Sequence, residues 1–299
     1  MKTYKNGVIA NDKISIDIYH GETMGFLGPN GAGKTTFIKQ IVGLLRPTEG
    51  DIKLFGNDVV AKPQIIPEYV AYLPQTLVSL DDFYVNEAIY YTGIFRGLTR
   101  KLAKSQTNDL LEMLAIPHLA KRIMRFLSGG QKQLVAIACV LIGYRPVIVL
   151  DEPTNNLDPI ARRSVWGILH NITKKYTAAL ILVTHNVLEA EQVLGRVAII
   201  DGGKIIALGT PDELKRQIES TVRIEFYYSG DIATKVEDPN LQCLTDSHYR
   251  IISQQTNVHS IIDNLVNKIG LNNMTDLHII PPSLEDVYIA LNGKDHEFT

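Results

Sequence analysis

The chain has 299 residues, of which 45% are hydrophobic, enough to bury a full core in one large domain and a smaller one. The 30 Lys and Arg nearly balance the 32 Asp and Glu, so no strong field directs the whole molecule to nucleic acid or anionic lipid. The two cysteines, Cys139 and Cys243, lack the spacing of metal ligands. This composition excludes disordered and disulfide-stapled proteins and favours a reducing compartment, with the cytoplasm expected.

Membrane-spanning segments are not predicted. The longest apolar runs, residues 134–142 and 178–183, fall well below the roughly 18 to 20 residues that cross a bilayer. The first residues also lack the long apolar stretch of a signal peptide. We therefore expect a chain that does not itself span a membrane.

Short apolar segments that end abruptly on small or polar residues predict buried parallel strands. They cover residues 23–27, 69–73, 147–150 and 179–183. In open parallel sheets, ligands bind at the carboxyl ends of the strands. We therefore expect the polar residues that follow these four segments to converge on one site.

The remaining pattern predicts two domains. In residues 1–220, a helical insertion at about 76–143 interrupts the strands, and the expected helices cover residues 85–95, 110–119, 132–143, 187–193 and 211–218. Residues 221–299 read as a small α+β domain with strands at 222–228, 249–253 and 277–280 and helices at 259–269 and after Pro281-Pro282. The fold class is therefore α/β, with a mixed or parallel sheet, plus a small α+β domain.

A glycine-rich loop after the first strand fits the pattern G-x-x-x-x-G-K-[ST]. It consists of Gly28, Pro29, Asn30, Gly31, Ala32, Gly33, Lys34, Thr35 and Thr36. Its glycines let backbone N–H groups form an anion nest at a helix N-terminus, and Lys34 adds a charge for the β and γ phosphates. The Thr35 hydroxyl is placed to ligate Mg²⁺, and Thr36 to donate to phosphate. The loop predicts nucleotide binding without choosing between kinases, GTPases and transport ATPases.

Two adjacent acids follow the strand at 147–150. Asp151 is expected to hold Mg²⁺, and Glu152 to polarise the water that attacks the γ-phosphate. Beside a phosphate loop, this pair predicts nucleotide hydrolysis rather than a simple strand cap.

The segment LSGGQ at 127–131 precedes a predicted helix, and LDEPTNNLD covers 150–158. Together with the phosphate loop, these segments resemble the ATP-binding-cassette (ABC) family, which implies a P-loop nucleotide-binding domain that binds ATP and Mg²⁺. The resemblance implies that Ser128, Gly129, Gly130 and Gln131 contribute to the nucleotide site of a second ABC ATPase subunit, either a copy or a homologue. Ser128 and Gly130 would close on its γ-phosphate, so that ATP joins the two subunits head to tail.

Other positions are implied by the same resemblance. His185 is similar to the switch histidine that contacts the γ-phosphate and orients Glu152 and water. Gln75 is similar to the glutamine that senses Mg²⁺ and the attacking water at the root of the helical insertion. Tyr4, a short distance before an expected strand at 14–18, resembles the aromatic that stacks on adenine. Asp158 resembles the acid of the loop that crosses the dimer interface, although Asn155-Asn156 departs from the small-residue pair common there.

The carboxyl-terminal segment PSLEDVYIAL at 282–291 resembles the tail of bacterial exporter ATPases that move drugs, peptide antibiotics, lipids or polysaccharides. The family implies a separate polytopic permease as partner, docked on residues 77–91, and a location at the cytoplasmic face of the membrane. No nucleic-acid partner is expected. The alternatives are a soluble ABC protein that acts on ribosomes, DNA ends or cluster assembly, and a regulatory ABC ATPase that pumps nothing. Tandem cassettes or a long coiled-coil interruption would favour the soluble class, and neither occurs in the sequence.

Overall fold

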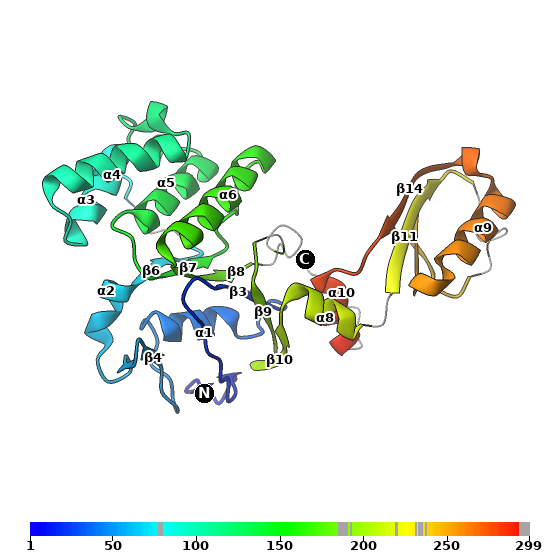
Figure 1. Cartoon of the computed structure of the whole chain (residues 1–299), viewed down its shortest axis with the longest axis horizontal. Helices are drawn as coiled ribbons and strands as arrows, with labels where there is room; N and C mark the ends of the chain where they lie inside the picture. The colour runs from blue at the N-terminus through cyan, green and yellow to red at the C-terminus, as the bar shows by residue number, and fades with distance from the viewer. Residues whose placement is uncertain are drawn as a thin grey trace. The chain divides into compact units, whose positions relative to one another are not determined.

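The computed structural model describes residues 1–76, 80–184, 191, 193–218, 221–230, 232, 236 and 238–292. The chain forms two compact units, Met1–Thr210 and Pro211–Thr299 (Figure 1). Within the described ranges, no helix has both the length and the apolar character needed to cross a membrane.

A six-stranded sheet in the order β10-β9-β3-β8-β7-β6 forms the centre of the first unit. The five strands from β9 to β6 are parallel, and β10 pairs antiparallel with β9. Their bounds are β3 Thr23–Leu27, β6 Val70–Leu73, β7 Val147–Asp151, β8 Ala179–Val183, β9 Arg196–Asp201 and β10 Lys204–Gly209. The four predicted strands are confirmed, and their carboxyl ends meet at one edge of the sheet.

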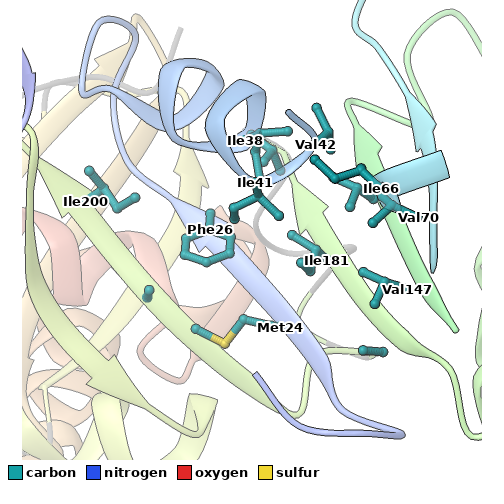
Figure 2. Close-up of a cluster of buried hydrophobic side chains, with 14 of the residues drawn as sticks. Met24, Phe26, Ile38, Ile41, Val42, Ile66, Val70, Val147, Ile181 and Ile200 are labelled. Carbon is teal, nitrogen blue, oxygen red and sulfur yellow. The ribbon is translucent and has the colours of Figure 1, made fainter. Parts of the chain in front are cut away.

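Helix α1 (Lys34–Ile41) packs on one face of this sheet, while α5 (Gly129–Leu141) and α6 (Pro159–Tyr176) lie over the other (Figure 1). Ile38 and Ile41 of α1 point toward Phe26 of β3, within one cluster of buried apolar side chains (Figure 2). Burying each such side chain contributes about 1.5–3 kcal/mol. This packing fixes the N-terminus of α1 at the carboxyl end of β3.

The other helices of the first unit are α2 Ile66–Tyr69, α3 Val85–Phe95, α4 Arg100–Met113, α5 Gly129–Leu141 and α6 Pro159–Tyr176. The helix predicted at 110–119 is wrong in its bounds, because α4 begins earlier and ends at Met113. Ala115 then adopts a left-handed backbone with φ 57°, and a 3₁₀ turn follows at Pro117–Leu119. Of the helix predicted at 187–193, all but Glu191 and Val193 lie outside the described residues.

The predicted strand at 14–18 is also wrong. The N-terminal strands are β1 Lys2–Thr3 and β2 Ile9–Asn11, which pair with each other. Residues 14–18 form no strand, although Ile14, Ile16 and Ile18 pack against the core cluster. The alternation therefore reports apolar packing without a hydrogen-bonded partner strand. A second short hairpin pairs β4 (Lys53–Leu54) with β5 (Asn57–Asp58).

The second unit contains an antiparallel sheet in the order β12-β13-β11-β14. Its elements are α8 Pro211–Gln217, β11 Thr221–Tyr228, β12 Leu241–Thr245, β13 His248–Gln254, α9 Val258–Ile269, β14 Met274–Ile280 and α10 Leu284–Asn292. Helix α9 buries Leu265 and Ile269 against Phe226 and Ile251 of the sheet. Helix α8 packs against α10, so the boundary between the units falls before α8, whereas the sequence pattern places it at residue 220.

The segment that resembles an exporter tail begins α10 with a capping box. Ser283 N–H donates to Asp286 Oδ2 at 2.7 Å, and Asp286 N–H donates to Ser283 Oγ at 3.3 Å. Leu284, Val287 and Tyr288 are buried. These residues therefore stabilise the second unit.

Candidate nucleotide site

The phosphate loop needs glycine at two positions for steric as well as conformational reasons. Gly28 and Gly33 have φ of 144° and 101°, in the region that favours glycine. A Cβ at Gly28 would clash with the Ile200 carbonyl oxygen, and one at Gly33 with the Ala10 carbonyl oxygen. The phosphate loop thus lies directly against β9 and β2. The backbone of these two strands restricts which residues the loop can carry at positions 28 and 33.

The Lys34 side chain folds back and binds the first residues of its own loop. Its Nζ donates to the Gly28 and Pro29 carbonyl oxygens at 2.6 and 2.8 Å, and the side chain is buried. Burial lowers the pKa of Lys34, whereas the Glu152 and Asp151 carboxylates raise it. The loop carbonyls therefore hold the ammonium in place, where both carboxylates act on it.

Sequence reasoning missed the residues that brace this loop. Asn11 Nδ2 donates to the Gly33 carbonyl oxygen at 3.1 Å, and Gln40 Nε2 donates to Asn11 Oδ1 at 2.6 Å. Gly203 N–H donates to the Ala32 carbonyl oxygen at 3.1 Å. Among these residues, the sequence marks only Gly203, because the Gly202-Gly203 pair is typical of a turn. The pair does not indicate that this turn contacts the phosphate loop.

Asp151 is the last residue of β7 and lies next to Val183 of β8. Its side chain is only 2% exposed, and Oδ2 has no hydrogen-bond partner among the described residues. Burial, and then the Glu152 carboxylate, raise the pKa of Asp151 to about 6, although Lys34 opposes the rise. A buried carboxylate oxygen without a partner is costly unless a cation or donor arrives.

The residues present fit a magnesium ion that binds together with a nucleotide. No group of three or more His, Cys, Asp and Glu in the described part of the chain is arranged to hold a metal. Mg²⁺ commonly takes one or two protein ligands and completes its shell with phosphates and water. Asp151 Oδ2 and the hydroxyl of half-buried Thr35, in the first turn of α1, would supply that small protein share.

Glu152 begins a tight turn immediately after β7. Its φ is 55°, a left-handed conformation that costs a non-glycine residue about 1–3 kcal/mol. Its N–H donates to the Val183 carbonyl oxygen at 2.8 Å, and the residue is 8% exposed. The two acids thus differ in backbone conformation, with Asp151 in the strand and Glu152 in the left-handed region.

The signature segment forms the N-terminal cap of α5. Ser128 Oγ accepts from Gln131 N–H at 3.3 Å, and Gln131 Oε1 accepts from Ser128 N–H at 3.1 Å. A Cβ on Gly130 would lie 2.6 Å from the Asn156 carbonyl oxygen, and one on Gly129 would touch the Asn156 side chain. The signature glycines are therefore required in part because this cap packs on the loop after Glu152.

Asp158 and Tyr4 have partners within the chain. Asp158 Oδ1 accepts from the backbone N–H groups of Ile160 and Ala161, both at 3.0 Å, and so caps α6. The Tyr4 hydroxyl lies 3.2 Å from Thr36 Oγ1, and the tyrosine is 41% exposed. The structure thus brings Tyr4 to the end of the phosphate loop.

The carboxyl edge of the sheet gathers the other predicted residues. Gln75 is exposed and follows β6 by two residues, while buried Thr184 follows β8. His185 lies outside the described residues. The loop after β3, the acids after β7 and Gln75 after β6 therefore share one edge.

Comparisons with known proteins agree with this arrangement. The family model described as ABC transporter matches residues 11–155. The chain is 36% identical over 221 residues to the doxorubicin resistance ATP-binding protein DrrA of Mycobacterium tuberculosis, covering 74% of this chain and 66% of that protein. It is 31% identical over 300 residues to the Nod factor export ATP-binding protein I of Rhizobium etli, covering 99% of this chain and 92% of that protein.

Solved structures give the same result. An ATP-binding subunit of an ABC transporter shares 29% identity at a TM-score of 0.65, over 70% of this chain and 86% of that one. The dimeric post-hydrolysis state of the ATP-binding cassette MJ0796, bound to ADP and Pi, shares 25% identity at a TM-score of 0.64, over 70% and 95%. Because these neighbours share the fold and the match to the Nod factor export protein extends over 99% of the chain, we conclude that this chain belongs to the ATP-binding-cassette family and is an ABC-type ATPase.

Proposed function

We propose that this chain is the motor subunit of an exporter: it binds Mg-ATP, dimerises around two nucleotides and drives a separate polytopic membrane protein from the cytoplasmic face. The observation that carries the hydrolytic part is the buried group of Lys34, Asp151 and Glu152, whose charges act on one another at the carboxyl edge of the sheet. The relatives named for drug resistance and for Nod factor export support the transport part.

The proposed chemistry is transfer of the γ-phosphoryl group to water. The water oxygen bonds to the γ-phosphorus, the bond to the β–γ bridging oxygen breaks, and Glu152 accepts the water proton. Lys34 and the N-terminus of α1 hold the phosphates, while Gln75 and His185 orient the water. When bound at Asp151 and Thr35, Mg²⁺ offsets negative charge on the phosphate oxygens.

In the proposed dimer, the phosphate loop of one subunit faces the signature cap of the other. Support comes from α5, whose N-terminus begins at Gly129 and is suited to an anion, although the phosphate loop of the same chain already uses α1 for that task. Ser128 and Gly130 would then contact the γ-phosphate of the partner site, with Asp158 at the interface and Tyr4 on adenine. The dimeric cassette of similar fold supports this arrangement.

We assign docking of the membrane partner to an aromatic patch formed by Phe83, Tyr84 and Tyr91. These side chains are 41%, 43% and 43% exposed, and the rings of Phe83 and Tyr91 pack edge to face at 6.2 Å. A hollow of about 490 Å³ beside the patch is lined by Leu80, Asp81, Asp82, Phe83 and Arg125. Exposed aromatic clusters of this kind commonly mark protein interfaces.

The test combines capture with hydrolysis. The tagged chain is purified from its native membranes in mild detergent, and co-purifying proteins are identified by mass spectrometry. Phe83→Glu should lose a polytopic partner yet retain the ATPase activity of the isolated chain. Leu44→Glu, which changes an apolar residue that is 67% exposed after α1, should lose neither. Recovery of only soluble assemblies with the parent chain would favour a soluble or regulatory ABC ATPase. Equal loss of the polytopic partner in both variants would contradict the assignment of docking to the aromatic patch.

A further inference from the structure

The carboxamide of Gln133 reaches from the signature helix to the turn that carries Glu152. Gln133 lies in the second turn of α5, and only 5% of it is exposed. Its Nε2 donates to the Pro153 carbonyl oxygen at 3.0 Å and to the Glu152 carbonyl oxygen at 3.4 Å. A buried amide that bonds two consecutive carbonyls fixes the backbone between them.

The turn that Gln133 contacts needs such support. Glu152 has a left-handed backbone, and conformations of this kind persist only where the surrounding structure holds them. The Glu152 N–H donates to the Val183 carbonyl oxygen of β8. The Glu152 carbonyl oxygen accepts from Asn155 N–H at 3.3 Å and from the Gln133 side chain. Of these contacts, the one from Gln133 is made by a side chain, so it alone can be removed by substitution.

Helix α5 supports the far end of the same turn through Gly130. The Gly130 Cα lies so close to the Asn156 carbonyl oxygen that a Cβ would reach 2.6 Å. Asn156 is itself left-handed, with φ 63°. The first two turns of α5 therefore contact the segment after β7 at both of its left-handed residues.

We infer that Gln133 is a positioning residue for hydrolysis: it holds the Glu152–Pro153 backbone so that the Glu152 carboxylate meets the attacking water. The inference rests on the proposed role of Glu152 as the base. Gln133 is assigned no contact with nucleotide or water, and acts only through the backbone of the base. Its loss should therefore reduce the chemical step and leave nucleotide binding intact.

The primary variant is Gln133→Met, which keeps the length and helix propensity of the side chain but removes the donor. A catalytic group misplaced by about 1 Å loses about 100-fold in rate, so we expect kcat to fall by about 10- to 100-fold. The Kd for Mg-ADP, measured by calorimetry on the full chain, should stay within about twofold, because the Gln133 carboxamide donates to the Glu152 and Pro153 carbonyls and not to the phosphate loop. A kcat within about twofold of the parent, in a variant that binds Mg-ADP normally, would overturn the inference.

Gln106→Met is the matched control. Gln106 on α4 accepts from Gly143 N–H at 2.9 Å, so it is also a glutamine bonded to backbone, but its partner precedes β7, whereas the acid pair stands at the carboxyl end of that strand. It should lower the unfolding midpoint without lowering kcat. A second variant, Gln133→Glu, keeps the shape and places acceptors against the two carbonyls; it should lose at least as much kcat as Gln133→Met. If Gln133→Met fails to fold, the Gln133→Glu variant decides: parental kcat in that variant would contradict the inference.

Glu152→Gln, run in parallel, separates two kinds of failure. If it abolishes hydrolysis while the Gln133 variants keep parental kcat, only the positioning role fails. If Glu152→Gln itself hydrolyses ATP at the parental rate, the base assignment fails, and the inference fails with it.

Discussion

Replacing Asp151 by Asn is expected to make the nucleotide-free chain progressively more stable than the parent as pH rises from 5 to 7.5. Asp151 is 2% exposed and its Oδ2 has no hydrogen-bond partner in the described part of the chain. Burial, followed by the Glu152 charge, raises its pKa from 3.8 to about 6, against the opposing charges of Lys34 and Lys39. The folded chain therefore holds the Asp151 proton more tightly than the unfolded chain does.

The sign and size follow from proton linkage. Below pH 3.8 the acid is protonated in both states, so its shifted pKa has no effect on stability. As pH rises from 3.8 to about 6, the folded chain keeps the proton that the unfolded chain releases, so the free energy of unfolding falls by about 1.4 kcal/mol per pH unit. Above this range the loss is complete, at about 3 kcal/mol. Between pH 5 and 7.5 the loss grows by about 1.4 kcal/mol. The Asp151→Asn variant has no such loss, so its advantage over the parent widens by that amount.

Urea unfolding without nucleotide or Mg²⁺ measures this difference. Trp166, the single tryptophan, is buried in α6, so its fluorescence reports on the first unit. Asp51→Asn, at a side chain that is 63% exposed, is the control and should differ from the parent by a constant amount. An Asp151→Asn advantage that stays flat or narrows with rising pH would refute the reasoning. The variant should also lose Mg²⁺-dependent hydrolysis.

Three further predictions concern the site. Gly130→Ala places a methyl group 2.6 Å from the Asn156 carbonyl oxygen, so it should lower both kcat and the free energy of unfolding, the latter by about 1–3 kcal/mol. Urea unfolding and steady-state kinetics measure the two effects, and an unchanged kcat would count against contact between the cap and the catalytic turn. Asp158→Ala removes the cap of α6 and should cost about 1 kcal/mol in urea unfolding, whereas a neutral result would mean that the cap is dispensable. Tyr4→Phe keeps the ring but removes the contact with Thr36, so the affinity for ATP, measured by calorimetry, should change by less than about threefold. A larger loss of affinity would show that the hydroxyl, rather than the ring, contributes to binding.

The central sheet could be predicted because β3, β7 and β8 are continuous apolar runs that are buried on both faces. The prediction of a strand at residues 14–18 failed because an apolar pattern reflects the burial of side chains and not the pairing of the backbone. The alternating isoleucines pack against the core although no partner strand pairs with them. Helix α6 (Pro159–Tyr176) is not among the helices predicted from the sequence, although Asp158-Pro159 is a typical helix start.

The candidate site divides in the same way. Lys34, Asp151 and Glu152 could be named from the sequence because their spacing from strands and helices is local. The contacts of Asn11 with Gly33 and of Gln133 with Pro153 join residues about 20 apart through side-chain amides, and no local pattern encodes them. Glutamine and asparagine in such positions look like ordinary polar residues until the fold brings their partners within reach.

The least favourable groups of the candidate nucleotide site are those that a Mg-nucleotide would satisfy on binding. The Asp151 carboxylate is buried without a partner at Oδ2 among the described residues, and the Lys34 ammonium is desolvated by burial. Both arrangements destabilise the nucleotide-free chain, yet each charge is complementary to a ligand, Asp151 to a cation and Lys34 to phosphate. We therefore expect the relief of these penalties to contribute to the free energy of Mg-nucleotide binding. The Asp151→Asn variant should be more stable than the parent when unfolding is measured without nucleotide, yet it should be stabilised less by Mg-ATP.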